Sequence, residues 1–468
     1  MNWTRNEHLI AGEWVTNAGH PTPVENPATL ETVGTTAAGT GADAAVAIEA
    51  ASAALPGWSL SSSEERQAAL LDLAAQVRLR ANELVAILVA ELGTPERVAR
   101  DIHVAATIAD LEGFADALGK FSFETEIGNS LVVREALGVV ACITPWNYPT
   151  HQIAAKVGGA IAAGCTVVLK PSEVTPLSAY LLGDALLAST VPAGVVNIVF
   201  GTGDTVGQTL VMSRDIDAIS FTGSTTVGRS IAEIGARRMI PVALELGGKS
   251  ASIVLDDADL ETAVAWSVRS ATVNSGQTCS ACTRLIVPAK LADQVTELAR
   301  EGAAALRVGD PQLDVDLGPL ASRAQYDRVT GMLESARRTG AVVRQADLTT
   351  DLPGYFVPPA IVNGADPASA IAQEEVFGPV LVIQGAADTS EAVRLANFSP
   401  YGLGGAVWSS DPDRATLVAR RLRTGQVDIN GAAWNLQAPF GGTKSSGSGR
   451  ELGIHGILEF TELKSIQR

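Results

Sequence analysis

Two of the four cysteines in the chain, Cys279 and Cys282, stand three residues apart in 276-GQTCSAC-282. A pair with this spacing can bind a metal ion, exchange disulfides or include one nucleophilic thiolate. A structural zinc site needs four ligands, but the sequence has no second C-x-x-C and its five histidines are scattered. A thioredoxin-like pair belongs to small domains with a different lead-in. We therefore expect no metal site, and either one nucleophilic cysteine or none.

Two further stretches hold side chains suited to carbonyl chemistry. In 144-TPWNYP-149 two prolines flank Trp146, Asn147 and Tyr148, and an asparagine amide can donate a hydrogen bond to a developing oxyanion. In 245-ELGGK-249 the glycines leave Glu245 free to move, as a general base requires. Taken alone, each stretch is equally compatible with an ordinary polar loop. No G-x-S-x-G stretch is present to indicate a serine nucleophile.

Three other stretches carry residues that suit a nucleotide. Lys170 and Glu173 in 168-VLKPSE-173 follow an apolar strand pattern, where open parallel sheets bind ligands. The run 201-GTGDTVG-207 is a glycine-rich turn, one residue longer than the usual dinucleotide fingerprint. Ser224 in 221-FTGST-225 can contact a phosphate or cap a helix. Taken alone, each stretch also has an ordinary structural interpretation. KPSE could be a solvated loop, the glycine-rich run a plain strand-to-helix turn, and Ser224 a helix N-cap.

Composition limits the classes of partner and compartment. A length of 468 residues predicts two or three domains, and a net charge of -17 disfavours nucleic acid and anionic membrane surfaces. The apolar windows, such as 84-LVAILVA-90, are shorter than the roughly 20 residues of a spanning helix. With few cysteines and no signal-peptide pattern, we expect a cytoplasmic protein with reduced thiols.

Hydrophobic periodicity indicates the elements that would position these residues. Residues 42–118 read as helices, with an N-cap pattern at 62-SSEE-65. From residue 131 onward, short apolar strands alternate with helix-length segments, which predicts buried parallel sheets. We expect two α/β domains with a boundary near 246-LGGK-249. Ligands often bind between domains, so the stretches near this boundary gain weight.

Taken together, these stretches occur in the order and spacing of one family. TPWNYP, KPSE, the glycine-rich turn, FTGST, ELGGK, GQTC, 374-EEVFGPV-380 and 439-PFGGTKSSGSGRELG-453 resemble the NAD(P)-dependent aldehyde dehydrogenase superfamily, from about residue 10 to the C-terminus. The resemblance implies two doubly wound α/β domains, a Rossmann-like cofactor domain (1–117 and 137–248) and a catalytic domain (249–445). It also implies oligomerisation segments at 118–136 and 446–468, and hence a homodimer or homotetramer.

The resemblance also implies a reaction and its residues. Cys279 would attack the aldehyde, Asn147 and the Cys279 N–H would form the oxyanion hole, and Glu245 would activate water to hydrolyse a thioester. Lys156 matches the lysine that follows the PWN loop in the family. The cofactor contacts carried over are Trp146, Lys170, Ser172, Glu173, Gly203, Gly207, Phe221, Gly223, Ser224, Leu246, Glu375 and Phe377. Because a carboxylate at Glu173 would repel a 2′-phosphate, NAD should be preferred, with NADP possible.

Substrate contacts follow from the same resemblance. They are Tyr148, Gln152, Ala155, Thr278, Ser280 and Trp434, and the two aromatic rings among them suit a broad range of apolar or aromatic aldehydes. Carboxylate-bearing semialdehydes are disfavoured, because relatives that use them tend to place an arginine where Ala155 stands. Two alternatives stay open: a CoA-acylating aldehyde dehydrogenase, and a non-catalytic NAD-binding structural relative. The presence of Glu245 argues against the first, and the presence of Cys279 and Asn147 argues against the second.

Overall fold

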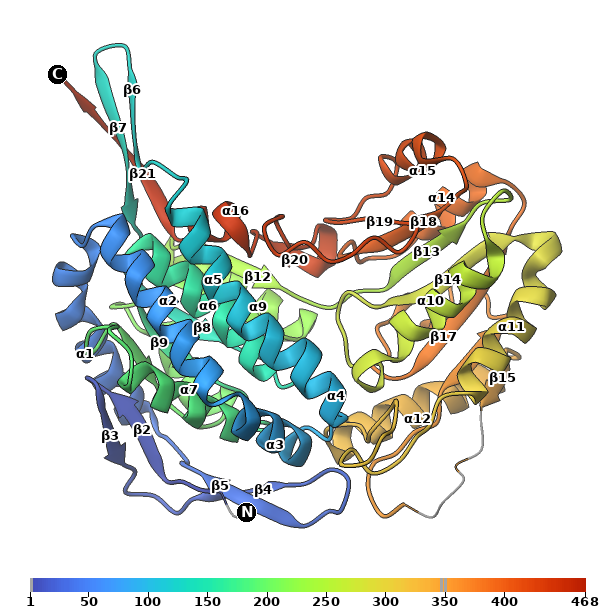
Figure 1. Ribbon diagram of the computed structural model, residues 1–468, viewed down its shortest axis with the longest axis horizontal. Coiled ribbons are helices and arrows are strands. Elements are labelled where there is room, and N and C mark those ends of the chain that lie inside the picture. Colours follow the sequence, from blue (N-terminus) through green and yellow to red (C-terminus); the bar gives the residue numbers. More distant parts are fainter. Residues whose placement is uncertain (1–2, 346–347, 349–351) are drawn as a thin grey trace.

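The structure is a computed structural model that describes residues 3–345, 348 and 352–468. Two lobes lie side by side, each built on its own β-sheet, and a slender hairpin projects from one of them (Figure 1). Short strands near the N-terminus, β1 (Trp3–Thr4), β4 (Thr22–Glu25) and β5 (Thr32–Thr36), form a separate small sheet. The predicted α/β fold is confirmed.

The first lobe contains an eight-stranded sheet in the order β20-β12-β11-β8-β9-β10-β2-β3. Five adjacent strands run parallel: β12 (Val242–Glu245), β11 (Ala218–Thr222), β8 (Val139–Ile143), β9 (Thr166–Lys170) and β10 (Val196–Ile198). The edges are antiparallel, formed by β20 (Gly447–Ser448) on one side and by β2 (Glu7–Ile10) and β3 (Glu13–Thr16) on the other. The chain builds β8, β9 and β10 outward in one direction and then crosses to β11 and β12. This reversal places a topological switch point between β8 and β11.

Helices cover both faces of this sheet. They are α1 (Gly41–Ser59), α2 (Ser63–Leu79), α3 (Ala81–Glu91), α4 (Glu96–Val98), a π-helical turn at Ala99–Val104, α5 (Ala105–Leu118), α6 (Pro149–Ala163), α7 (Leu177–Leu187), α8 (Gln208–Met212) and α9 (Thr225–Arg238). The N-cap predicted at Ser62 is confirmed, because its hydroxyl accepts from the Glu65 N–H in a capping box. The glycine-rich turn at Gly203–Gly207 is itself one π-helical turn ahead of α8.

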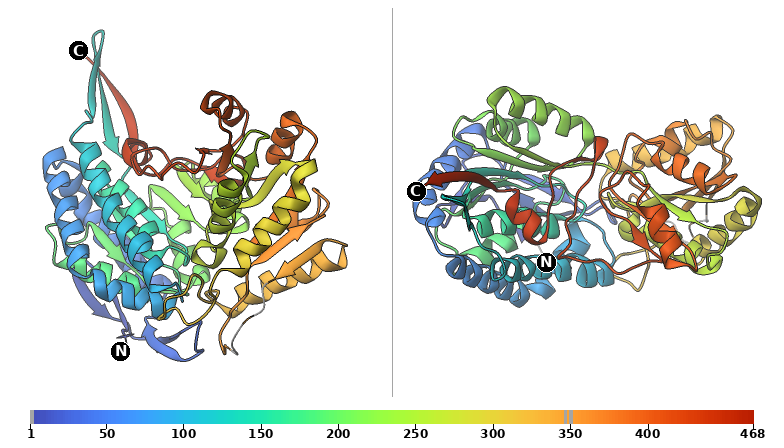
Figure 2. Two further views of the ribbon diagram at one scale, coloured as in Figure 1. Left: turned by 45° about the vertical axis from the view of Figure 1, so that its right-hand side comes forward. Right: turned by 90° about the horizontal axis from the view of Figure 1, so that it is seen from above.

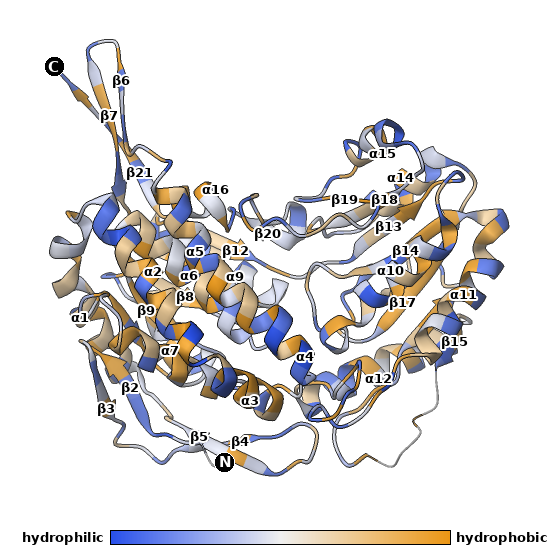
Figure 3. Cartoon of the chain, viewed as in Figure 1, coloured by the Kyte–Doolittle hydropathy of each residue, from blue (hydrophilic) through white to orange (hydrophobic). Residues whose placement is uncertain are grey.

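The second lobe contains a seven-stranded sheet in the order β15-β16-β17-β14-β13-β18-β19. Its strands are β13 (Ser250–Val254), β14 (Cys282–Pro288), β15 (Val342–Gln345), β16 (Ala360–Asn363), β17 (Val380–Ala386), β18 (Gly405–Trp408) and β19 (Asp428–Ile429). All neighbours are parallel except the β15–β16 pair. β14 and β17 are coloured mainly as hydrophobic in Figure 3, as expected for strands covered on both faces. The covering helices are α10 (Leu260–Thr272), α11 (Ala292–Ala304), α12 (Arg323–Arg338), α13 (Ala370–Gln373), α14 (Thr389–Asn397) and α15 (Pro412–Ala419).

The projecting hairpin consists of β6 (Glu124–Ile127) and β7 (Ser130–Ala136), and the C-terminal strand β21 (Thr461–Gln467) pairs antiparallel with β7. Figure 2 shows this three-stranded sheet extending away from both lobes. Ahead of β21, the short helix α16 (Gly453–Leu458) packs against α5 and α6. In the part of the chain that the structure describes, no helix has both the length and the apolar character to cross a bilayer.

The change from one sheet to the other falls between β12 and β13, at the stretch 246-LGGK-249. The domain boundaries themselves remain a prediction. The predicted oligomerisation segment 446–468 packs partly within the first lobe, because β20 joins the eight-stranded sheet and α16 packs on α5 and α6.

Candidate active site

Five sequence motifs meet along one edge of the first sheet. TPWNYP follows β8, KPSE follows β9, the glycine-rich turn follows β10, FTGST spans the end of β11, and ELGGK begins at the end of β12. Since these five strands are adjacent and parallel, their carboxyl ends lie side by side. Open α/β sheets bind ligands at this edge, next to the switch point. The sheet therefore gathers segments that are up to about a hundred residues apart in the sequence.

The second lobe contributes loops from the opposite end of its strands. ELGGK leads into β13, GQTC precedes β14, EEVFGP precedes β17, and the loop around Tyr401 precedes β18. The site thus lies between the carboxyl edge of one parallel sheet and the amino edge of another. The ELGGK segment passes directly from one edge to the other.

The loop that carries Cys279 has an unusual backbone. Three consecutive residues, Asn274, Ser275 and Gly276, have φ angles of 53°, 57° and 74°. A Cβ at Gly276 would lie 2.2 Å from the backbone of Gly378, so only glycine fits there. Such a strained conformation persists only where surrounding contacts enforce it, and it is often found at active sites.

Hydrogen bonds fasten this loop to the PWN loop. The Asn274 amide donates to the Asn147 carbonyl at 2.8 Å, and the Asn147 amide donates to the Gln277 carbonyl at 2.9 Å. Gln277 is in turn fixed, because its Oε1 accepts from the Ala321 N–H at 2.8 Å. Asn147 and Gln277 are both buried, so these bonds are shielded from water. The position of Asn147 relative to Cys279 is therefore set by reciprocal contacts between two loops.

Cys279 lines two cavities that lie on either side of it. One has a volume of about 340 Å³ and extends to the FTGST and EEVFGP segments, while the other has about 540 Å³ and extends to α5 and Trp434. Gln152 also lines both. Burial raises the pKa of the Cys279 thiol, and the nearby carboxylates of Glu375 and Glu245 raise it further. Cys282 is a buried free thiol outside both cavities.

The first cavity has the chemistry of a dinucleotide site. Ser224, Thr225 and Thr226 line it at the N-terminus of α9, where free N–H groups and the helix dipole favour phosphate. Trp146 and Phe377 line it as an edge-to-face pair with ring centroids 5.3 Å apart. The carboxylate of Glu375 supplies an acceptor for ribose hydroxyls. The residues present therefore fit NAD. Further lining residues are Pro145, Asn147, Thr222, Gly223, Leu246, Gly247, Gln325, Arg328 and Tyr401.

Two hydrogen bonds hold Glu375 in this cavity, one from the ELGGK stretch and one from α12. Its Oε1 accepts from the Gly248 N–H at 2.9 Å, and Arg328 donates to its backbone carbonyl at 2.6 Å. Burial raises the pKa of Glu375 to about 7, although the Gly248 N–H, Lys249 and Arg328 counteract that rise. Gly248 also touches the loop that carries Cys279, since a Cβ there would lie 2.3 Å from the Cys279 carbonyl oxygen.

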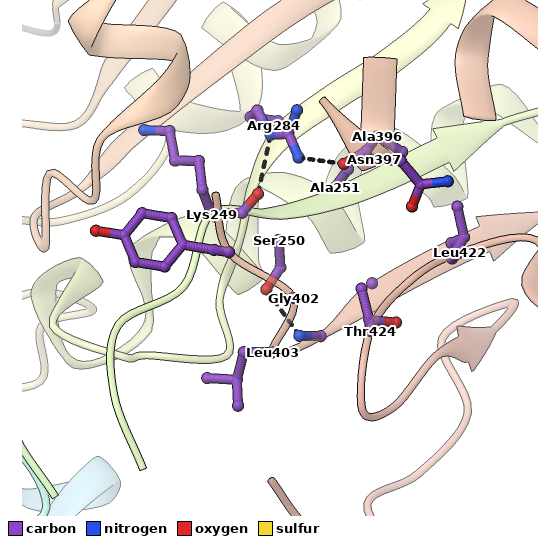
Figure 4. Close-up of a pocket in the computed structure, with 13 residues that line it drawn as sticks. Lys249, Ser250, Ala251, Arg284, Ala396, Asn397, Gly402, Leu403, Leu422 and Thr424 are labelled. Carbon is purple, nitrogen blue, oxygen red and sulfur yellow. Dashed lines mark hydrogen bonds between the residues drawn. The ribbon is translucent and has the colours of Figure 1, made fainter. Parts of the chain in front are cut away.

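A buried arginine, Arg284, bonds to the backbone immediately before β13 (Figure 4). Arg284 donates to the carbonyl of Lys249 at 2.9 Å, and to the carbonyls of Leu395 and Ala396 at 2.8 Å each. Ser250 accepts from the Gly404 N–H at 3.3 Å in the same pocket. Burial, followed by the charge of Arg284, lowers the pKa of the Lys249 ammonium to about 7, and its Nζ has no hydrogen-bond partner among the described residues.

Glu245 lies at the end of β12 in a buried, charged environment. Neither carboxylate oxygen has a hydrogen-bond partner within the described residues. Burial raises its pKa well above the ordinary value and Glu451 adds to the rise, while Lys156 and Arg450 oppose it. Lys156 is itself buried, with its Nζ 2.6 Å from Oε1 of Glu451 and 3.2 Å from Oγ of Ser220. The charge of Lys156 therefore works to lower the pKa of Glu245. Lys156 does not line either cavity.

The KPSE segment lies beside the glycine-rich turn. Lys170 Nζ is 2.5 Å from Oε2 of Glu173. Glu173 remains exposed, and its partial desolvation would raise its pKa, but the charge of Lys170 and the Gly203 N–H outweigh that effect and lower the pKa. Thr175 donates to the Trp146 carbonyl at 3.0 Å, which ties this loop to the PWN loop. Lys170, Ser172, Glu173, Gly203 and Gly207 lie at the sheet edge beyond the residues that line the first cavity.

The second cavity is mainly apolar. Its walls are formed by Ile102, Ala105, Ala106, Ala109, Val273, Trp434, Leu436 and Phe440, with Asp101, Tyr148, His151, Gln152, Thr278, Cys279 and Ser280 as the other lining residues. The Tyr148 hydroxyl and the Thr278 hydroxyl are hydrogen-bonded at 2.7 Å. Of the predicted substrate contacts, Ala155 alone does not line this cavity. It is buried in a cluster with Leu403, Phe440 and Leu452 that contacts Cys279.

Several lining residues were not predicted from the sequence. Ile102, Ala105, Ala106 and Ala109 have helical spacing, but they carry no polar group that distinguishes them from core residues. Gln325 and Arg328 lie on α12 and bond to the backbone of 375–377. His151 immediately precedes the predicted contact Gln152. No local pattern indicates its partner Asp110, which lies 41 positions earlier. No cluster suited to a metal ion occurs among the residues that the structure describes.

Comparison with known proteins identifies the family. Residues 14–466 match the aldehyde dehydrogenase family. A 3-succinoylsemialdehyde-pyridine dehydrogenase from a Pseudomonas species is 43% identical, with 98% of each chain covered. A Cys-to-Ala mutant of aldehyde dehydrogenase C from Pseudomonas syringae, complexed with NAD+ and octanal, superposes with a TM-score of 0.97 at 41% identity, covering 99% of this chain and 96% of that one. An aldehyde dehydrogenase from Mycobacterium tuberculosis, complexed with NAD+, has a TM-score of 0.96 at 35% identity, with coverages of 100% and 99%. The chain belongs to the aldehyde dehydrogenase family and is an NAD(P)-dependent aldehyde dehydrogenase.

Proposed function

We propose that the protein oxidises apolar or aromatic aldehydes to carboxylic acids with NAD, through covalent intermediates on Cys279. The observation that carries the proposal is that Cys279 lines both cavities. An aldehyde in the larger cavity and a nicotinamide in the smaller one would both reach its sulfur. When bound, NAD supplies the acceptor for the hydride of the aldehyde carbon.

The residues of the chain then divide the reaction between them. The Cys279 thiolate attacks the aldehyde carbon, and the Asn147 amide and the Cys279 N–H stabilise the resulting oxyanion. Loss of hydride from this thiohemiacetal leaves a thioester on Cys279. Glu245 accepts a proton from the water that attacks the thioester and then passes it to the departing sulfur, so that the carboxylic acid and the Cys279 thiol are released. Because burial raises the thiol pKa, a base is needed to form the thiolate, and Glu245 is suited to that step as well.

The larger cavity favours an apolar substrate. Its walls are aliphatic and aromatic, and no lysine or arginine is among its lining residues within the described chain. A relative that binds octanal and another named for an aromatic semialdehyde are consistent with this choice. A homodimer or homotetramer, joined through the β6–β7 hairpin and β21, is part of the proposal.

Replacement of Cys279 tests the assignment. We expect Cys279→Ala to lose at least about 10³-fold in NADH formation, as for removal of a covalent nucleophile, while NAD binding, followed by quenching of tryptophan fluorescence, persists. Cys282→Ser is the matched control and should retain turnover. Full NADH formation by Cys279→Ala, or NADH formation by the parent protein only when CoA is present, would contradict the proposal.

A further inference from the structure

One polar pair interrupts the apolar wall of the larger cavity. Nδ1 of His151 lies 2.6 Å from Oδ2 of Asp110, which is fully buried on α5. His151 is in the first turn of α6, and its side chain retains 16% exposure into the cavity. Nδ1 and both carboxylate oxygens of Asp110 are shielded from solvent, and their contact is an ion pair without the geometry of a regular hydrogen bond, whereas Nε2 is not among the shielded atoms and has no partner within the described residues. The ring thus turns Nε2 toward the cavity.

The other polar side chains of this cavity are differently engaged. Tyr148 and Thr278 are bonded to each other at 2.7 Å. Gln152 lines both cavities and so lies at the end where Cys279 is found, and Ser280 is the immediate neighbour of Cys279. Asp101 is exposed and its carboxylate accepts hydrogen bonds, so His151 is the polar side chain available to donate to a part of the substrate other than its aldehyde.

We propose that His151, oriented by Asp110, binds a neutral hydrogen-bond-accepting group of the aldehyde substrate, such as a ketone oxygen or a heteroaromatic nitrogen. This inference rests on the proposed function and names the substrate class of that same site. The Asp110 carboxylate beside Nδ1 favours the imidazolium form of His151, which donates from Nε2, whereas a neutral ring with its proton on Nδ1 would accept there. Substrates that carry such an acceptor would be preferred over purely apolar aldehydes of the same size.

A carboxylate is a poorer fit than a neutral acceptor. Asp110 already balances the charge of His151, and Asp101 lines the same cavity. A second anion would also approach Glu451, whose charge acts on His151. Burial works to lower the pKa of His151, but Asp110 and Glu451 outweigh it and raise the pKa. The other ring facing this region, His103, stacks on Tyr148 with centroids 4.4 Å apart, and burial lowers its pKa to about 3, so it stays neutral.

The test compares three aldehydes with the same number of non-hydrogen atoms: heptanal, 5-oxohexanal and 5-oxopentanoate. Benzaldehyde and pyridine-3-carbaldehyde form an aromatic pair. The measured quantity is the kcat/KM ratio of acceptor to apolar aldehyde within each pair, compared between the parent and each variant. Intrinsic reactivity cancels because the same two substrates are used throughout. We expect His151→Leu and Asp110→Asn to lower this ratio about tenfold, the effect of losing one hydrogen bond to a charged group.

His151→Gln keeps an N–H donor and should retain part of the preference. Ile102→Val, which lines the same cavity, should shift both members of each pair alike. An unchanged ratio in His151→Leu would overturn the proposal. So would a larger loss for 5-oxopentanoate than for 5-oxohexanal, because the pair would then be an anion site.

A binding measurement separates this inference from the proposed function. Titration calorimetry of 5-oxohexanal and heptanal on Cys279→Ala, with and without His151→Leu, reports the same preference without turnover. If the parent oxidises no aldehyde but the preference in binding disappears with His151, the proposed function fails and this inference stands. Equal binding preference in both proteins would overturn the inference alone.

Discussion

The side-chain amide of Asn147 donates to the main-chain carbonyl of Gln277 at 2.9 Å, two residues before Cys279. A second hydrogen bond runs in the opposite direction, because the side-chain amide of Asn274, in the same loop as Gln277, donates to the Asn147 carbonyl at 2.8 Å. The proposed oxyanion donor and the proposed nucleophile are thus held by the same pair of loops. An amide has two N–H groups, so one can orient the side chain while the other meets the oxyanion.

Replacement of Asn147 separates these two functions. Asn147→Ala should lower kcat by about 10²–10³-fold, as for loss of one oxyanion donor, and should leave NAD affinity nearly unchanged. Asn147→Asp keeps the shape but places an acceptor beside the Gln277 carbonyl and should also lose activity. Single-turnover measurement of NADH formation checks whether the loss falls on thiohemiacetal formation. A loss confined to NAD binding would contradict the assignment.

The raised pKa of Glu245 predicts the pH dependence of turnover. A base must be deprotonated, so hydrolysis should accelerate as pH rises through this raised pKa. Glu245→Gln should lower turnover by about 10²–10⁴-fold and remove that dependence, and it should slow the first burst of NADH less than it slows turnover. Rapid-mixing measurement of the burst against pH tests this. Equal loss of the burst and of turnover would exclude a role confined to deacylation.

The same shift has a consequence for stability. Because the folded-state pKa of Glu245 exceeds that of the unfolded chain, the unfolded chain releases this proton first as pH rises. Stability from this site is therefore lost between the ordinary carboxyl pKa and the raised one, and stays lost above it. Glu245→Gln cannot ionise, so its Tm relative to the parent should increase across that window. A Tm difference that is constant from acidic to neutral pH would contradict the shifted pKa.

The preference for NAD over NADP should depend on Glu173. Glu173 is exposed, and the charge of Lys170 and the Gly203 N–H lower its pKa, so its carboxylate would repel a 2′-phosphate. Glu173→Ser should improve kcat/KM for NADP relative to NAD by at least about tenfold, the equivalent of 1.4 kcal/mol. Steady-state kinetics with each cofactor measure this ratio. Glu31 is an exposed carboxylate that directly precedes β5 in the small N-terminal sheet. The control variant Glu31→Ser should leave the NADP-to-NAD ratio unchanged.

Arg284 should matter for folding more than for chemistry. Its guanidinium satisfies the carbonyls of Lys249, Leu395 and Ala396 in a buried pocket. Arg284→Ala leaves these acceptors unpaired and opens a cavity, so we expect a loss of about 3–5 kcal/mol in the free energy of unfolding. Denaturant titration measures it. At temperatures where the variant remains folded, weaker NAD binding should accompany the loss, because Gly248 and hence Glu375 are released.

Much of the site could be predicted from residue types and order. Cys279, Asn147 and Glu245 stand in distinctive local sequences. The apolar strand patterns before TPWNYP, KPSE and FTGST indicated that these three motifs lie at the same edge of one sheet. Local patterns suffice here because a parallel strand followed by a loop always presents that loop at the carboxyl edge. The N-cap at Ser62 was predictable for a similar reason, since capping depends on residues within one turn.

Contacts between distant segments could not be predicted in this way. Arg328 reaches the Glu375 carbonyl from another helix, Asp110 meets His151 across two helices, and Lys156 pairs with Glu451 nearly three hundred positions away. A charged residue in a helix has the same local signature whether it is solvated or paired in the interior. Only burial and the approach of a second element distinguish the two cases.

The sequence by itself determined the family-specific motifs, the alternation of strands and helices, and the identity of the sulfur, amide and carboxylate groups. The tertiary structure alone decided that the carboxyl edge of one sheet faces the amino edge of another, with Cys279 lining a cavity on each side. It also decided the electrostatic environment, in which Glu451 and Lys156 act on Glu245 in opposite directions. The physical reason is that desolvation and charge interactions depend on distances in space, and the fold sets those distances between residues that are remote along the chain.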